Sequence, residues 1–252
     1  GNAMAGVFDM KLRNGNNEKR ESSVQVGLLG IDLSSEGPFK KGKQATYLFN
    51  YRYSTLSLLA GLGLFNQSQV PAFQDFSFKL NFPTQKAGTL SVWGIGAMDH
   101  ALEKESTDSS KWETNWDRVR NDWRLSMGAM GISHKILLGS GTYLNTTLAA
   151  SDVSNVADIQ RVDDQLTLQP DAKISDQSWR ATLSSVLNHK FNASFSLRTG
   201  VNYHRLFYNL DVNSTVNNIP GTFRNITSSN GETGFAEYFM QTRYHINPAI
   251  SI

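Results

Sequence analysis

The chain has 252 residues, a formal net charge of +2 and no cysteine. So small a net charge excludes the broad basic field of a nucleic-acid-binding protein. The lack of cysteine excludes disulfides, thiol nucleophiles and thiolate metal sites. The longest apolar run, residues 56–65, contains Ser57, Gly61 and Gly63 and is much shorter than the roughly 20 apolar residues of a membrane-spanning helix.

The first 39 residues predict an apolar strand over 5–12, a polar connector over 13–20 and two short strands over 21–28 and 30–36. A glycine and a proline at 37–38 mark the turn that follows. By pattern alone, this is the start of an antiparallel meander.

The same residues resemble a known junction, the place in TonB-dependent outer-membrane receptors where the plug domain ends and the β-barrel begins. The residues that match the last plug strand are Asn2, Ala3, Ala5, Gly6, Val7, Phe8, Met10, Leu12 and Arg13. The residues that match the turn of the first barrel hairpin are Glu36, Gly37, Pro38 and Phe39. The resemblance implies that residues 1–16 are the last plug strand and its connector, that 17–252 are the N-terminal part of the barrel, and that the chain is a piece of a longer protein.

Eight further strands and the start of another are predicted along the chain. In 73–82, Phe76 and Phe78 alternate with Asp75 and Lys79, which is the period of two that gives a strand one apolar and one polar face. In 123–136, the four residues Trp123, Leu125, Met127 and Ala129 are expected to share one face. The predicted strands are 44–55, 73–82, 89–100, 123–136, 142–152, 178–190, 195–210 and 235–246, with the beginning of one more at 249–252.

The connections between these strands are predicted to alternate in length. The short turns are 39–43, 83–88, 137–141, 192–194 and 247–248. The longer segments are 65–72, 101–122, 154–177 and 211–233. Short turns on one side and long loops on the other are typical of a bacterial outer-membrane barrel with periplasmic turns and extracellular loops.

The predicted fold class is therefore all-β, an antiparallel transmembrane β-barrel meander of about ten strands. The resemblance implies that these belong to a 22-strand barrel filled by the plug. Ten strands enclose too little space for a folded domain. We therefore expect an open arc in which the segment 21–28 does not pair with 235–246.

The two faces of the strands predict two environments. Aromatic and aliphatic residues of one parity are expected to face lipid: Tyr47, Phe49, Phe76, Phe78, Leu197, Tyr203, Tyr238 and Tyr244. Charged residues of the other parity are expected to face the lumen and contact the plug: Arg52, Asp75, Lys79, Arg124, Arg180, Arg198, Glu237 and Arg243. Direct contact of these residues with substrate is the less favoured interpretation.

The long segment 101–122 carries the candidate substrate-binding residues, which are Trp112, Trp116, Arg118 and Arg120. Indole rings stack on sugars and on apolar groups, and guanidinium pairs with carboxylates. The favoured alternative is that the two tryptophans pack on a neighbouring loop or lie at the outer membrane interface.

No catalytic or metal-binding motif is present. The five histidines are dispersed and none has the HExxH spacing, and no G-x-S-x-G occurs. We therefore expect no enzyme, no metal and no cofactor.

The resemblance implies an outer-membrane receptor that binds a scarce nutrient outside and imports it in an energised way. The TonB complex would act through a region upstream of Gly1. Membrane lipid, a surface lipoprotein or other outer-membrane chains are further expected partners, nucleic acid is not, and the expected location is the bacterial outer membrane. The alternative, from a different class, is a passive pore or a structural barrel component of a larger assembly.

Overall fold

The computed structural model describes residues 10–27, 30–64, 72–216, 219, 222–247 and 250–251. The predicted plug-strand residues Asn2, Ala3, Ala5, Gly6, Val7 and Phe8 lie outside these residues. From Met10 to Arg20 the chain forms no strand and leads into the first one.

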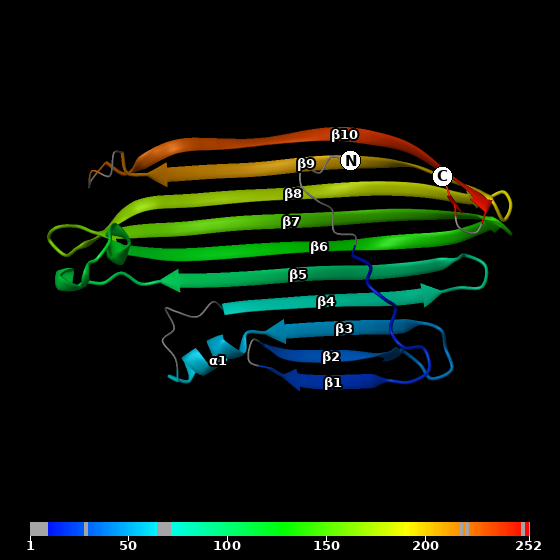
Figure 1. Ribbon diagram of the computed structural model, residues 1–252, viewed down its shortest axis with the longest axis horizontal. Coiled ribbons are helices and arrows are strands. Elements are labelled where there is room, and N and C mark those ends of the chain that lie inside the picture. Colours follow the sequence, from blue (N-terminus) through cyan, green and yellow to red (C-terminus); the bar gives the residue numbers. More distant parts are fainter. Residues whose placement is uncertain are drawn as a thin grey trace.

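Among the described residues, eleven strands form one antiparallel sheet in which neighbours in sequence are neighbours in space (Figure 1). The strands are β1 (Glu21–Val26), β2 (Ile31–Pro38), β3 (Thr46–Tyr53), β4 (Ala72–Pro83), β5 (Thr89–Glu103), β6 (Val119–Gly139), β7 (Thr142–Val162), β8 (Leu168–Lys190), β9 (Phe195–Ser214), β10 (Arg224–Asn247) and β11 (Ile250–Ser251). The predicted nearest-neighbour meander is confirmed.

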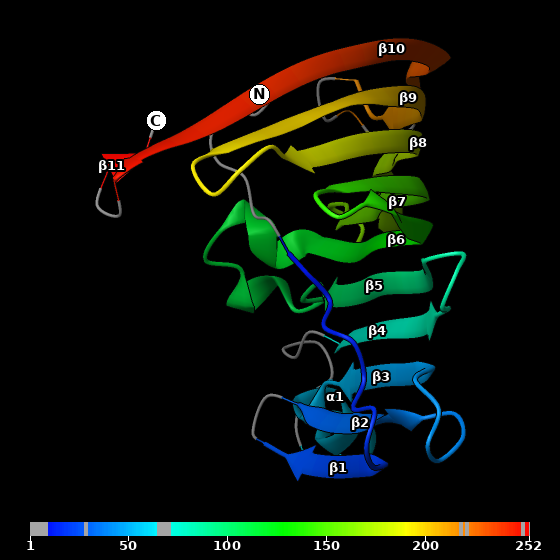
Figure 2. The same ribbon diagram turned by 90° about the vertical axis from the view of Figure 1, so that its right-hand side faces the viewer.

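The sheet is an open arc over the described residues. Within them, β1 pairs only with β2, and β10 pairs with β9 and β11. Figure 2 shows β1 and β10 at opposite ends of the stack of strands. The predicted lack of pairing between the first barrel strand and 235–246 is therefore confirmed.

The predicted long segment 154–177 is wrong. β7 continues to Val162 and β8 begins at Leu168, so the two strands are joined by the short turn 163–167. Because a strand needs only about 9–11 residues to cross the hydrocarbon layer, the rest of these strands can extend beyond it with polar residues on both faces. Such a stretch lacks alternation and is therefore mistaken for a loop in the sequence. For the same reason, the predicted long segments 101–122 and 211–233 are shorter in the structure, where the connections are 104–118 and 215–223.

One helix was not predicted. The apolar run after β3 forms α1 (Thr55–Gly61), whose first turn is capped by the Ser54 hydroxyl accepting the backbone N–H of Ser57. Two 3-10 turns, Ser109–Lys111 and Asn115–Arg118, lie between β5 and β6. Among the described residues, no helix has the length and apolar character needed to cross a bilayer.

Strand register places the eight residues predicted to face lipid on one side of the sheet, which we call the outer face. This face can be followed from β4 to β9 along one row of residues, each opposite the next: Phe78, Gly94, Met130, Ala150, Ala181 and Arg205. Phe49 is 45% exposed and Tyr238 is 82% exposed, so these side chains do not lie in a protein core. We call the opposite side the inner face.

In β6, the grouping of Trp123, Leu125, Met127 and Ala129 on one face is correct, but that face is the inner one. Ala129 is opposite Ile95 in β5, whereas Met130 is opposite the outer-face residue Gly94. Because β6 carries apolar residues on both faces, its own pattern does not say which face is outer, and only the pairing with β5 does.

Candidate functional site

The connector, residues 10–20, crosses the inner face of β3 and β4 (Figures 1 and 2). A Cβ atom at Gly15 would lie 2.0 Å from the backbone oxygen of Tyr47, so only glycine permits this approach to β3. One strand further on, Lys79 Nζ donates to the backbone oxygen of Leu12 at 2.8 Å. The chain that leads into the barrel wall is therefore held against its inner face.

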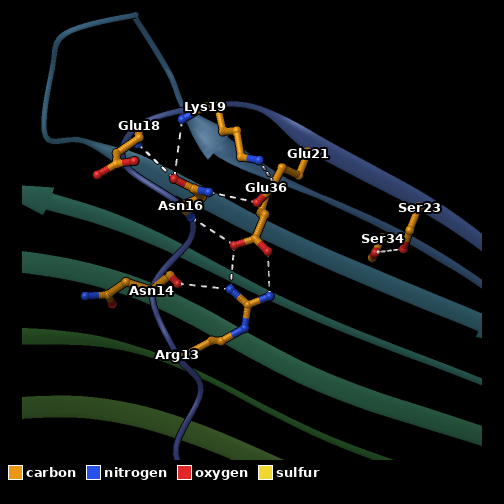
Figure 3. A network of polar contacts seen from close by, with 9 residues as sticks. All are labelled: Arg13, Asn14, Asn16, Glu18, Lys19, Glu21, Ser23, Ser34 and Glu36. Atoms are coloured by element: carbon orange, nitrogen blue, oxygen red, sulfur yellow. Dashed lines mark hydrogen bonds and ion pairs between the residues drawn. The ribbon is translucent and has the colours of Figure 1, made fainter.

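Glu36 on β2 is the centre of the contacts that hold the connector (Figure 3). Both terminal nitrogens of Arg13 donate to its carboxylate, at 2.5 and 2.6 Å, and the backbone N–H of Asn16 donates to it at 2.9 Å. Glu36 is opposite Leu48, which is in turn opposite Lys79, and this row lies on the inner face. A bidentate arginine–carboxylate pair fixes orientation as well as adding attraction.

The side chain of Asn16 orders the turn that enters β1. Its carbonyl oxygen accepts the backbone N–H groups of Glu18 and Lys19, and its amide donates to Glu21 at 2.7 Å. Arg20 then donates to the backbone oxygen of Phe39 at 3.0 Å, beyond the end of β2. The connector is thus attached to the wall at several points along its length.

Seven of the eight residues predicted to face the lumen lie on the inner face. They are Arg52, Asp75, Lys79, Arg180, Arg198, Glu237 and Arg243. Their roles remain predictions.

Arg124 is the exception, and its predicted lumen position is wrong. It is opposite His100, in the register of the outer face, toward the end where the long loops lie. There it donates to Asp122 at 2.8 Å, and Asp122 also accepts from His100. Since β6 has apolar residues on both faces, its charged residues could not be assigned to a face from sequence.

Two of these inner-face residues pair with each other, and a third lies close to a histidine. Arg52 pairs with Asp75 at 2.8 Å, and Glu237 lies 3.6 Å from His204. The contacts of Glu36 with Arg13 and Asn16 were missed from sequence. Arg13 and Glu36 were noted only as matches to family motifs, and no local pattern joins residues 23 positions apart.

In the loop between β5 and β6, Trp112 is packed rather than free. Its indole N–H donates to the backbone oxygen of Ser106 at 2.7 Å, and the Arg118 guanidinium lies 4.7 Å from its ring centroid. Arg118 also donates to the backbone oxygen of Val162 at 2.7 Å, which ties this loop to the β7–β8 hairpin. Trp112 is therefore held by residues of its own loop, and its proposed part in substrate binding remains a prediction.

The other two candidate ligand residues differ from each other. Arg120 is paired with Glu105 at 2.8 Å, whereas Trp116 is 76% exposed. Asn115, which precedes Trp116 in the chain, lines a cleft of about 310 Å³ between the loop and the β7–β8 turn. Charged residues line it, among them Arg118, Arg161, Asp163, Asp164 and Asp171.

The charges of this cleft are mostly satisfied within the wall. Arg161 pairs with Asp171 at 2.9 Å, and Asp163 accepts backbone N–H groups of Gln165 and Thr167. The bond from Thr167 is the main cause that lowers the pKa of Asp163. Within the described residues, no group of three or more His, Asp or Glu side chains is arranged to hold a metal ion.

No protein-family model matches the chain. No curated protein sequence matches it either. Among solved structures, it is similar to the open form of the ferric-catecholate import receptor Fiu from E. coli K12, with a TM-score of 0.54 and 9% sequence identity over 93% of this chain and 46% of that one. The closed form gives a TM-score of 0.55 and 9% identity over 93% and 43%.

The chain therefore spans less than half the length of the structures it matches. At this identity the likeness concerns the fold, and an outer-membrane location agrees with it. It also agrees with the resemblance of the first 39 residues. The fold of this chain is therefore similar to part of the β-barrel wall of these receptors, an all-β antiparallel meander.

Proposed function

We propose that this chain is part of an outer-membrane receptor that binds a scarce nutrient outside the cell and imports it with energy supplied through TonB. One observation carries the proposal: the segment that leads into the barrel is held on the inner face of the wall, by Glu36 and Lys79. A chain that enters from the inside suits a barrel with a domain in its lumen. A passive pore needs an open lumen and has no use for such a connector.

The proposed division of the chain is the one that the family resemblance implies, and the same contacts support it. Residues 1–16 would end the plug, and 17–252 would form the first part of the wall. Arg13 and Asn16 then lie at the junction, where they attach the plug to β2 through Glu36. The region that contacts the TonB complex would precede Gly1, and force applied there would reach the wall through this connector.

The long-loop end is the proposed side of nutrient capture. Trp116 is exposed there, and a charged cleft lies between its loop and the β7–β8 turn. The family resemblance implies iron chelates, cobalamin, glycans or peptides as substrate classes. A ferric catecholate is the first compound to test, because the solved structures of similar fold are those of a ferric-catecholate import receptor.

Uptake assays in paired strains test the function. The complete receptor is expressed in cells that lack their own receptor for each compound, with and without TonB, and uptake of labelled ferric catecholates, cobalamin, glycans and peptides is measured. We expect one class to enter only when TonB and a proton-motive force are present. Uptake that does not depend on either would replace this proposal with the passive pore.

A further inference from the structure

The inner face of the wall is divided by charge. On β1–β4 it carries the four carboxylates of Glu21, Asp32, Glu36 and Asp75, and the two cations of Arg52 and Lys79. The inner face of β6–β10 differs in the part that extends from the short turns to the row of residues that contains Arg180. There, the described side chains include five cations and the single carboxylate of Glu237. We call these five the basic patch: Lys135, Arg180, Lys190, Arg198 and Arg243.

The cations of the basic patch have no acidic partner among the residues that the structure describes. All five side chains are exposed. Lys135 lies over the ring of Tyr143 at 4.3 Å, and Arg198 lies 5.7 Å from the ring centroid of Phe239, so two of them contact aromatic rings and not carboxylates. By contrast, Arg52 on the acidic side is paired within the wall.

Three of these cations surround one hollow. Lys190, Arg198 and Arg243 line a depression of about 290 Å³ together with polar groups such as Gln241. Ser196 also lines it and is directly opposite Lys190 on one side and Arg243 on the other. Cations placed this close repel one another, and an anionic partner would relieve that repulsion.

The acidic side of the wall shows how its charge is used. The connector has four cations, Lys11, Arg13, Lys19 and Arg20, against the single carboxylate of Glu18. It docks on the carboxylates of β1 and β2, where Arg13 pairs with Glu36 and Lys19 with Glu21. The basic connector therefore lies on the acidic part of the inner face.

We propose that the basic patch is the docking surface for an acidic polypeptide face, carried by the domain that the proposed function places inside the barrel. The proposal rests on that function and adds an orientation: the acidic side of the domain faces β6–β10, and the side next to the basic connector faces β1–β4. Charge complementarity of this kind sets which surfaces meet and in which register. The patch extends over several strands and is open, which suits a protein surface better than a small ion.

A photo-cross-linker tests this proposal in the complete receptor, purified in detergent. Ser196 is replaced by a photo-reactive phenylalanine analogue, and the cross-linked peptides are identified by mass spectrometry. We expect cross-links to a segment of the same protein that is rich in Asp and Glu. In the triple variant Lys190→Gln, Arg198→Gln, Arg243→Gln, the yield should fall about tenfold, as for the loss of several exposed ion pairs.

The matched control removes the same charge from the same end of the sheet. Lys40→Gln, Lys41→Gln and Lys43→Gln change three exposed lysines in the β2–β3 turn and leave the basic patch intact, so the yield should not change. An equal loss in the control, cross-links to a segment without carboxylates, or no cross-link within the protein would overturn the proposal. The proposal would also be overturned if inorganic phosphate raised the melting temperature of the wild type but not of the triple variant, and no peptide cross-links were found.

Uptake measured with the same proteins separates this proposal from the proposed function. TonB-dependent uptake without cross-links at Ser196 would contradict only the proposed docking surface. Cross-links without TonB-dependent uptake would contradict only the proposed transport function.

Discussion

Lys79 on β4 donates a hydrogen bond to the backbone oxygen of Leu12, 67 positions earlier in the chain, at 2.8 Å. The contact joins the inner face of the wall to the segment that enters it. Together with the Arg13–Glu36 pair, it makes the connector part of the wall. The first two predictions concern this attachment.

Replacing Glu36 with Gln should release the connector. The change removes the charge that receives both Arg13 bonds and weakens the bond from Asn16, and hydrogen bonds to a charged group are worth about 1.5–3 kcal/mol. Because Arg13 is 67% exposed, we expect a smaller cost, about 1 kcal/mol. Trypsin should cut after Arg13, Lys19 or Arg20 several times faster. Glu18→Gln removes an equal charge from the connector and should leave the cleavage rate unchanged.

Gly15→Ala tests the close approach to β3. The new methyl carbon would lie 2.0 Å from the backbone oxygen of Tyr47, and a backbone atom cannot move aside as a side-chain tip can. The connector should detach locally while the sheet remains folded. Hydrogen exchange over residues 12–20 should therefore accelerate in G15A. Exchange as slow as in the wild type would mean that the connector does not lie on β3 in this way.

Arginine at Phe78 tests the outer face. The Phe78 ring lies over Gly94 on the face that we expect to contact lipid. A charge on a mid-membrane, lipid-facing site costs about 2–4 kcal/mol. Urea titration of the receptor folded in lipid vesicles should show this loss for Phe78→Arg and much less for Ser77→Arg, whose side chain faces inward. Equal losses would contradict the assignment of the two faces.

Cysteine labelling tests which end of the sheet is outside the cell. The chain has no cysteine, so single replacements report without background from its own residues. Glu113→Cys and Gln165→Cys, at the long-loop end, should react with an impermeant maleimide on intact cells. Lys86→Cys and Ser140→Cys, in the short turns, should react only after the outer membrane is permeabilised. The reverse pattern would invert the topology.

Asp117 should make the β5–β6 loop sensitive to acid. Its carboxylate accepts the backbone N–H of Thr114 at 2.6 Å, and this bond is the main cause that lowers its pKa. A carboxyl with a lowered folded pKa stabilises the folded loop above its ordinary pKa, and the stabilisation is lost as the pH falls through the folded value. Hydrogen exchange over 104–118, corrected for intrinsic rates, should stay slow at neutral pH and rise only below the usual range for Asp.

Two variants of the same loop check the cause of this acid response. Asp117→Asn should speed exchange already at neutral pH and remove the acid step. Glu113→Gln, an exposed residue of the same loop, should behave like the wild type. Identical pH profiles for Asp117→Asn and the wild type would contradict the role given to Asp117.

The sequence by itself determined where most of the strands lie. Where apolar and charged residues alternate, as in Phe76 to Lys79, the period of two fixes both the strand and its faces, because successive side chains point to opposite sides. The meander and the shared face of the eight apolar residues followed from this local pattern. The open arc was instead expected from the family resemblance, because ten strands enclose too little space for a plug domain.

Only the tertiary structure decided what depends on pairing between strands. The polar stretches on either side of the turn 163–167 are held in the sheet by backbone hydrogen bonds between β7 and β8 and carry no alternation to reveal it. The side on which Arg124 lies follows from its position opposite His100, because β6 has apolar residues on both faces. The docking of Arg13 on Glu36 joins residues that no local pattern connects, and it exists only because the sheet brings β2 under the connector.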